Sequence, residues 1–183
     1  MSARAKGTVL VTGAAGTVGN YVVPLAEAAG YRVIASDITA KGVQQPVRGE
    51  VRPGDLRDRE VLERLVAGCD AVIHTAALLD VGAPPSAIHE LNTGVVERLY
   101  DAATRAGVKR FVQISSAMIY AQGQKGPLTE SSGVDPRGEH GRSKLEAEAI
   151  LRAHRGEDEP AWTILRAPAV ERRRSSRSAR SRA

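Results

Sequence analysis

Short apolar runs alternate with amphipathic stretches from residue 8 to residue 165. The apolar runs are rich in β-branched residues, which predicts strands: Thr8–Thr12, Arg32–Ser36, Glu50–Arg52, Ala71–Thr75, Arg110–Ser115 and Trp162–Leu165. The stretches between them have helical spacing and predict helices at about 17–29, 58–67, 86–106 and 140–154. Gly30, Gly68 and Gly107 follow the first three helices, as glycine commonly does at helix C-termini. Residues 38–49 and 121–139 are rich in Gly, Pro and polar residues and predict loops.

This alternation predicts an α/β fold, in which a doubly wound parallel sheet carries helices on both faces. Right-handed crossovers between six strands give the Rossmann-like order 3-2-1-4-5-6. A chain of 183 residues is long enough for one well-buried domain and short for two. We therefore expect one domain over residues 1–170 and a disordered Arg/Ser-rich tail over residues 171–183.

The net charge of +5 comes from the tail. Of 26 Lys and Arg and 21 Asp and Glu, six arginines and one glutamate lie in residues 171–183, so residues 1–170 hold 20 of each sign. The balanced body argues against a specific nucleic-acid partner. A single cysteine, Cys69, excludes an internal disulfide and fits a reducing compartment. No stretch approaches the length of a membrane span or a secretory signal, so we expect a cytoplasmic protein.

The segment TGAAGTVG at residues 12–19 follows the first predicted strand and contains three glycines, Gly13, Gly16 and Gly19. Glycine permits a tight turn and lets the backbone approach a pyrophosphate closely. Thr17 and Val18 then open a helix whose unpaired N–H groups and positive dipole end attract phosphate. The spacing predicts a dinucleotide phosphate site, although an ordinary strand-to-helix turn would also contain such glycines.

Further candidates for cofactor binding follow the next strands. Asp37 closes the second strand, where a carboxylate binds both ribose hydroxyls of an adenosine and repels a 2′-phosphate, which favours NAD over NADP. As an alternative, Asp37 is a turn residue. Asp55 and Leu56 follow the third strand and Thr75, Ala76 and Ala77 the fourth, at the sheet edge where α/β folds bind ligands. Asp55 is a candidate acceptor for the adenine amino group or, alternatively, a helix cap. His74 has no partners at metal-ligand spacing, so we expect an interior histidine and no metal site.

These motifs resemble the extended branch of the short-chain dehydrogenase/reductase superfamily, the NAD-dependent epimerase/dehydratase type, over residues 7 to 170. TGAAGTVG resembles the family's TGxxGxxG, Asp55-Leu56 its adenine-binding pair, and residues 74–77 (HTAA) its H-x-A-A/G stretch. Residues 106–121 (AGVKRFVQISSAMIYA) resemble its GVKRFVYxSSxxVYG segment, and Asn92 matches its helix asparagine, although Val95-Val96 replace the usual Gly-Thr. The resemblance implies an NAD-binding domain with these residues at the cofactor.

The resemblance also implies a catalytic frame. Ser116 matches the residue that binds the substrate oxygen, and Lys144 matches the lysine of a Y-x-x-x-K pair that binds the nicotinamide ribose. The tyrosine of that pair is replaced by His140. Imidazole can shuttle protons near neutral pH, but it is shorter than a phenol, and a displacement of about 1 Å can cost on the order of 100-fold in rate. His140 is therefore either a weakened acid/base group or a surface residue at a helix end.

Two functions follow from this resemblance. The first is an NAD-dependent enzyme that transfers hydride at a carbinol or carbonyl carbon of a small molecule, such as a sugar nucleotide, with Ser116, His140 and Lys144 at its centre. The second is a non-catalytic NAD(P)-binding sensor or a truncated remnant, because the family pattern changes at Glu171 to Arg/Ser-rich sequence. By resemblance, helices 86–106 and 140–154 would pair in a homodimer.

The charge distribution makes a testable prediction. Deletion of residues 171–183 will abolish any salt-sensitive retention on immobilised DNA or RNA, because the remaining body has no net charge. Retention of the shortened protein, measured against the full chain at several salt concentrations, would contradict this partition of charge.

Overall fold

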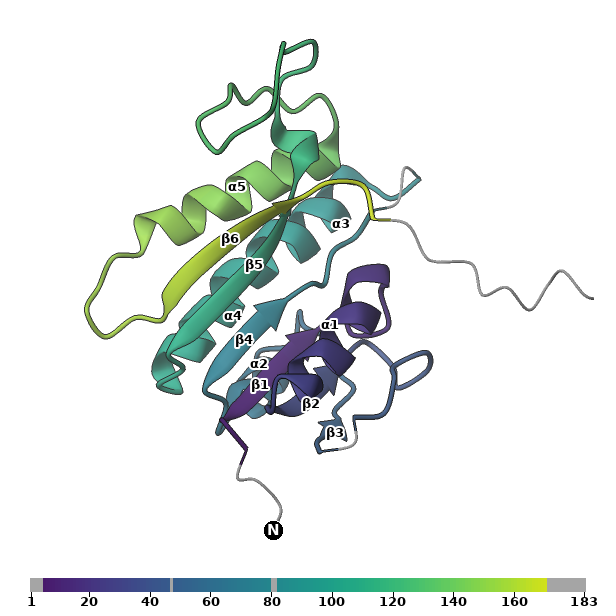
Figure 1. The fold of residues 1–183 in the computed structure, drawn as a ribbon, viewed down its shortest axis with the longest axis vertical. Coiled ribbons are helices and arrows are strands. Elements are labelled where there is room, and N and C mark those ends of the chain that lie inside the picture. Colours follow the sequence, from purple (N-terminus) through teal and green to yellow (C-terminus); the bar gives the residue numbers. More distant parts are fainter. Residues whose placement is uncertain (1–4, 47, 80–81, 171–183) are drawn as a thin grey trace, which may run out of the picture.

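The computed structural model describes residues 5–46, 48–79 and 82–170, so the predicted tail at 171–183 lies outside the described residues (Figure 1). Six parallel strands form one sheet in the order β3-β2-β1-β4-β5-β6, which confirms the predicted α/β fold and its 3-2-1-4-5-6 order. The strands are β1 (Thr8–Thr12), β2 (Arg32–Ser36), β3 (Glu50–Val51), β4 (Ala71–His74), β5 (Arg110–Ser116) and β6 (Ala161–Ala167).

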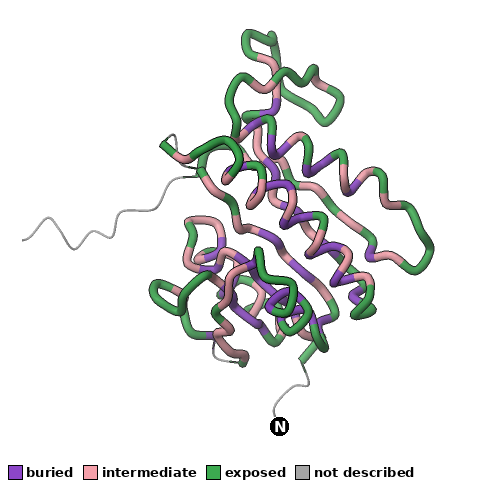
Figure 2. The backbone as a smooth tube through the Cα atoms, turned by 180° about the vertical axis from the view of Figure 1, so that it is seen from behind, coloured by how far each residue is buried: buried purple, intermediate pink, exposed green. Residues whose placement is uncertain are grey.

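Helices cover both faces of the sheet, as predicted, and Figures 1 and 2 view them from opposite sides. The α-helices are α1 (Thr17–Ala28), α2 (Arg59–Val66), α3 (Pro85–His89), α4 (Val95–Arg105) and α5 (Glu139–Ala153). A π-helical turn, η1 (Glu90–Gly94), joins α3 to α4, and a 3₁₀ turn, η2 (Ala117–Ile119), follows β5. Among the described residues, no helix has the length and apolar character needed to cross a membrane.

The strands divide their side chains between two cores because successive residues point to opposite faces. On one face, α1 packs through Val23 on β1 and β2, against Val9, Val11 and Val33. On the other face, α2, α4 and α5 bury the larger core, which includes Leu10, Ile34, Val72 and Phe111 of the sheet. The helices on the two faces therefore pack on β1 and β4 from both sides, next to the loops that follow these strands.

The single helix predicted over 86–106 is wrong in its interior. Residues 90–94 widen into the π turn η1, so the segment has three parts instead of one continuous α-helix. A π turn inserts one extra residue into a helical turn and often lies at a functional site. Here the wide turn contains Asn92 and Thr93, whose side chains are buried and bind other segments of the chain. The sequence period alone cannot reveal this insertion, because the apolar spacing on either side remains helical.

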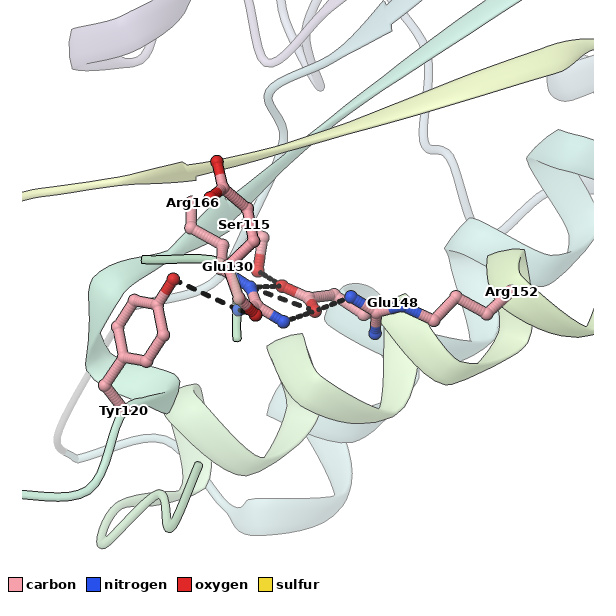
Figure 3. Close-up of polar contacts among 6 residues, drawn as sticks. All are labelled: Ser115, Tyr120, Glu130, Glu148, Arg152 and Arg166. Carbon is pink, nitrogen blue, oxygen red and sulfur yellow. Dashed lines mark hydrogen bonds and ion pairs between the residues drawn. The ribbon is translucent and has the colours of Figure 1, made fainter. Parts of the chain in front are cut away.

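A buried carboxylate joins α5 to β5 and β6, the last two strands of the sheet (Figure 3). Glu148 of α5 is 0% exposed. It accepts hydrogen bonds from Ser115 Oγ of β5 at 2.5 Å and from Arg166 of β6, whose Nη2 lies 2.8 Å from Oε2. Arg152, one turn further along α5, also donates to Oε2 at 2.8 Å. Arg166 then reaches the Tyr120 hydroxyl through Nη1 at 3.1 Å. This network sets the position of α5 relative to the end of β5.

Hydrogen bonding outweighs burial in setting the charge of Glu148. Burial raises the pKa of this carboxyl, but bonds from Arg166, Ser115 and Arg152 hold the pKa below its ordinary value. Because the pKa in the folded state is below that of an unfolded glutamate, about 4.3, the carboxylate stabilises the fold fully above that pH. This stabilisation is lost as the pH falls through the pKa of the folded state.

Glu148→Gln is expected to lower the free energy of unfolding by about 3–5 kcal/mol at pH 7, because it leaves two guanidinium groups facing a neutral amide. Glu63→Gln is the control: Glu63 forms an exposed pair with Arg59, and its loss should cost at most about 1 kcal/mol. Urea denaturation of both variants and the wild type measures the difference. The gap between Glu148→Gln and wild type should narrow as the pH falls below the ordinary glutamate pKa of about 4.3 and through the lower pKa of folded Glu148; a gap unchanged in acid would contradict the assignment.

Candidate functional site

The glycine turn between β1 and α1 lies against the segment that follows β4. Gly13 has φ +68°, and a Cβ there would lie 2.5 Å from the Ala76 nitrogen. Gly19 lies buried in the first turns of α1, where a Cβ would come 2.2 Å from the Gly13 carbonyl oxygen. Both positions therefore require glycine, one for backbone conformation and close approach and the other for packing of α1 on the turn. Gly16 is the N-cap residue of α1 and has no side chain to cover the first N–H groups of the helix.

A cleft of about 530 Å³ opens at the carboxyl ends of β1, β2, β3 and β4. Eight of the predicted cofactor residues line it: Gly13, Gly16, Asp37, Asp55, Leu56, Thr75, Ala76 and Ala77. Five others do not: Thr17, Val18 and Gly19 lie in α1, Asn92 is buried in η1, and Lys144 is buried in α5. Ala15, Ile38, Gly54, Arg57, Leu78, Ala87, Glu90 and Leu91 complete the lining and were not singled out from the sequence. Leu78 directly follows a recognised motif, whereas only the fold brings Ala87, Glu90 and Leu91 to the cleft.

The two acidic residues of the cleft have different surroundings. Asp37 accepts from the Ala15 nitrogen through Oδ2 at 2.9 Å and from the Ile38 nitrogen through Oδ1 at 2.8 Å. It therefore holds the glycine turn against the end of β2. The Asp55 carboxylate is bound by the Arg57 guanidinium, with Nη2 2.5 Å from Oδ2, and this pairing lowers the pKa of Asp55. An adenine amino group at Asp55 would share this carboxylate with Arg57.

Asn92 lies behind the cleft and holds the backbone of its wall. The side chain is 0% exposed. Its Oδ1 accepts from the Leu78 nitrogen at 2.7 Å, and its Nδ2 donates to the Leu78 carbonyl oxygen at 3.0 Å and to Ser143 Oγ at 3.1 Å. Asn92 thus connects the segment after β4 to α5. This arrangement makes Asn92 a support of the cleft wall, and the sequence expectation of cofactor contact has no counterpart in the cleft lining.

The three catalytic candidates are each bound to a main-chain group. The Ser116 hydroxyl, at the end of β5, accepts from the Met118 nitrogen at 3.1 Å. The Lys144 ammonium donates to the Ile114 carbonyl oxygen at 2.9 Å. His140 Nδ1 lies 3.3 Å from the Leu78 carbonyl oxygen. The fold therefore places His140 and Lys144 on one helix beside the end of β5, while none of the three is among the residues that line the 530 Å³ cleft.

Burial governs the protonation of both helix residues. Lys144 is only 3% exposed, and desolvation lowers its pKa to about 8. The pKa of His140 is also lowered, first by burial and further by the positive charge of Lys144, while the Leu78 carbonyl opposes the change. At neutral pH the imidazole of His140 is consequently kept in its uncharged form.

A row of buried polar side chains crosses the sheet beneath the site. His74 is completely buried, as expected, and its Nδ1 lies 2.7 Å from Thr12 Oγ1. Burial, reinforced by Lys144, lowers the pKa of His74 to about 3, so this ring is neutral. Strand pairing places Ser36 beside Thr12 and Gln113 beside His74, and both are also fully buried. The sequence did not reveal this row, because each residue occupies a position that alternation assigns to the apolar core.

Comparisons with known proteins identify the family. Residues 9–181 match the family model described as the NAD dependent epimerase/dehydratase family. UDP-glucose 4-epimerase 4 of Oryza sativa subsp. japonica is 32% identical over 175 residues, covering 86% of this chain and 47% of that protein.

Solved structures agree with this assignment. A short-chain dehydrogenase/reductase superfamily protein from Agrobacterium tumefaciens with bound NAD is 34% identical, with a TM-score of 0.77 over 87% of this chain and 48% of that one. MoeE5 in complex with UDP-glucose and NAD is 33% identical, with a TM-score of 0.72 over 87% of this chain and 54% of that one. The chain spans about half the length of these relatives. With the glycine turn, the cleft and the strand order in place, the chain belongs to the NAD-dependent epimerase/dehydratase family of the short-chain dehydrogenase/reductase superfamily.

Proposed function

We propose that this chain binds NAD in the cleft and transfers hydride at a carbinol or carbonyl carbon of a sugar nucleotide. The observation that carries the proposal is the turn at Gly13, where the main chain passes so close to Ala76 that a side chain would not fit. This turn leads into the N-terminus of α1, a favourable position for a pyrophosphate. The sugar-nucleotide class is supported by the UDP-glucose epimerase and the UDP-glucose complex among the relatives.

Asp37 supports NAD in preference to NADP. Each of its carboxylate oxygens accepts one backbone N–H and has a further lone pair for a ribose hydroxyl. A 2′-phosphate at the same position would bring negative charge against the carboxylate. Ala76 and Ala77, with small side chains on the opposite wall, leave room for the cofactor to pass.

The catalytic roles follow from the groups at the end of β5 and on α5. Bound NAD supplies the hydride acceptor. In the oxidation direction, Ser116 orients the substrate hydroxyl, and His140 takes the hydroxyl proton as the carbon loses hydride. Lys144 donates one of its three N–H groups to the Ile114 carbonyl oxygen, and the other two N–H groups remain for a ribose hydroxyl.

A second candidate function is nucleotide binding without turnover. The observation that favours it is His140 at the position where the family pattern has tyrosine. Imidazole is shorter than phenol, so its nitrogen stays closer to the helix than a tyrosine oxygen would. The atom that exchanges a proton with the substrate is therefore displaced. In either function we propose a homodimer that pairs α4 and α5 with their mates.

Calorimetric titration of the full chain with NAD tests cofactor binding, and Asp37→Asn tests its specificity. We expect the variant to bind NAD about tenfold more weakly, because hydrogen bonds to a charged carboxylate are lost. Its NADP affinity should fall less, so that the preference for NAD shrinks. Asp158→Asn, an exposed change in the loop between α5 and β6, should leave both affinities unchanged. Absence of NAD binding by the wild type would overturn the proposal.

Restoring the family residue distinguishes the two functions. If the chain is a weakened enzyme, His140→Tyr should raise the rate of NAD reduction with UDP-sugars on the order of 100-fold, as expected for a repositioned acid/base group. His89→Tyr, at an exposed histidine of α3, is the matched control and should change nothing. Rates are followed by NADH absorbance. Rapid turnover by the wild type would exclude a binding-only role, while zero turnover in both proteins would favour it.

A further inference from the structure

The backbone of Leu78 is held by two side chains at once. Asn92 binds both its nitrogen and its carbonyl oxygen, at 2.7 and 3.0 Å, and His140 Nδ1 lies 3.3 Å from the same carbonyl oxygen. Leu78 directly follows the Thr75–Ala77 wall of the cleft. The Leu78 carbonyl therefore connects the proposed cofactor site to α5, the helix that carries His140.

The chemistry of these atoms fixes where the protons lie. A backbone N–H can only donate, so the Asn92 atom beside the Leu78 nitrogen is the amide oxygen, and its NH₂ group faces the carbonyl. A carbonyl oxygen can only accept and has two lone pairs. One receives Asn92 Nδ2, and the other is left for His140. The Nδ1 atom of His140 must therefore carry a hydrogen to bond there.

We propose that the Leu78 carbonyl, held by Asn92, fixes neutral His140 as the tautomer protonated on Nδ1 and leaves Nε2 as the proton acceptor. In a neutral imidazole one nitrogen donates and the other accepts, so an Nδ1–H requires an unprotonated Nε2. Asn92 is accordingly a positioning residue. Its role as support for catalysis rests on the proposed function, whereas the tautomer itself does not.

Asn92 also places the other end of this hydrogen bond. Its Nδ2 donates to Ser143 Oγ at 3.1 Å, and Ser143 Oγ donates to the His140 carbonyl oxygen at 2.9 Å. One buried amide thus fixes both the acceptor at Leu78 and the helix turn that carries the imidazole. A base whose far nitrogen is oriented by a third group is the arrangement found in activated acid/base pairs.

The charged surroundings favour the same assignment. Lys144, one turn further along α5, places a positive charge near the ring and opposes a second proton, while the Leu78 carbonyl on the facing segment favours it. When Nε2 accepts a proton, the Nδ1–H bond to this carbonyl becomes charge-assisted and therefore stronger. The carbonyl then stabilises the imidazolium that the reaction forms.

The test is the tautomeric state of His140, read from long-range ¹H–¹⁵N spectra of the full chain labelled in its four histidines, near pH 8. His140→Phe assigns the signal. We expect a pyrrole-type Nδ1 and a pyridine-type Nε2. His89 and His154 serve as internal references, because their Nδ1 atoms lie 2.9 and 2.8 Å from carboxylate oxygens of Glu146 and Glu159. A wild-type His140 that carries its proton on Nε2 would overturn the proposal.

Two variants test the positioning role. Asn92→Asp keeps an acceptor for the Leu78 nitrogen but removes both Nδ2 donors, and we expect His140 to become a mixture of tautomers. Ser143→Ala removes only the link to the helix turn and should retain the Nδ1–H form. If His140 in Asn92→Asp keeps that form unchanged, the positioning role is refuted. The tautomer is measured without cofactor, so its result does not depend on whether the chain binds NAD. NAD titration of the same samples tests the proposed function separately.

Discussion

The close passage of the main chain at Gly13 over the main chain at Ala76 is the constraint on which the site depends. A Cβ at Gly13 would lie 2.5 Å from a backbone nitrogen, a separation that no side chain can adopt. The contact fixes the turn after β1 against the segment after β4. Two residues further, Leu78 is bound by Asn92 and His140. The cleft is therefore connected to His140 through one extended segment, which ends at Leu78, a lining residue whose carbonyl oxygen lies 3.3 Å from His140 Nδ1.

The sequence predicts the fold closely because its signals are local. Strand boundaries agree within a few residues, since alternation of apolar residues and helix-ending glycines are read along the chain. The π turn could not be predicted in this way. Its extra residue is stabilised by bonds from Asn92 and Thr93 to segments about 14 and 50 residues distant. Such a turn is determined by tertiary partners, which no local pattern records.

The candidate site also has one part that local sequence patterns predict and another part that depends on tertiary contacts. The glycine turn, Asp37 and the small residues after β4 could be recognised because their chemistry depends on residue type at a fixed place in a strand-turn-helix unit. The Glu148 network could not, because an acidic residue in a helix normally faces solvent. Only the fold shows that Glu148 of α5 is hydrogen-bonded by Ser115 of β5 and Arg166 of β6. The bond from the Lys144 ammonium to the Ile114 carbonyl oxygen also comes from the fold alone, because the two residues are 30 positions apart in the sequence.

The electrostatics of α5 explain how two buried ionisable groups, Lys144 and Glu148, coexist with the half-buried His140 on one helix. Glu148 remains charged because two arginines and a serine bind it. Among the described residues, Lys144 has no carboxylate as a hydrogen-bond partner; its ammonium donates to the Ile114 carbonyl oxygen. Burial lowers the pKa of Lys144 to about 8, which still leaves the ammonium mostly charged at neutral pH. Burial lowers the pKa of His140, and the Lys144 charge lowers it further, which keeps the imidazole neutral. A histidine in this position can therefore accept a proton at neutral pH, provided that the carbonyl of Leu78 is held where the ring needs it. In the proposed function, the acid/base capacity of the site would thus depend on a buried amide in a π turn as much as on the imidazole itself.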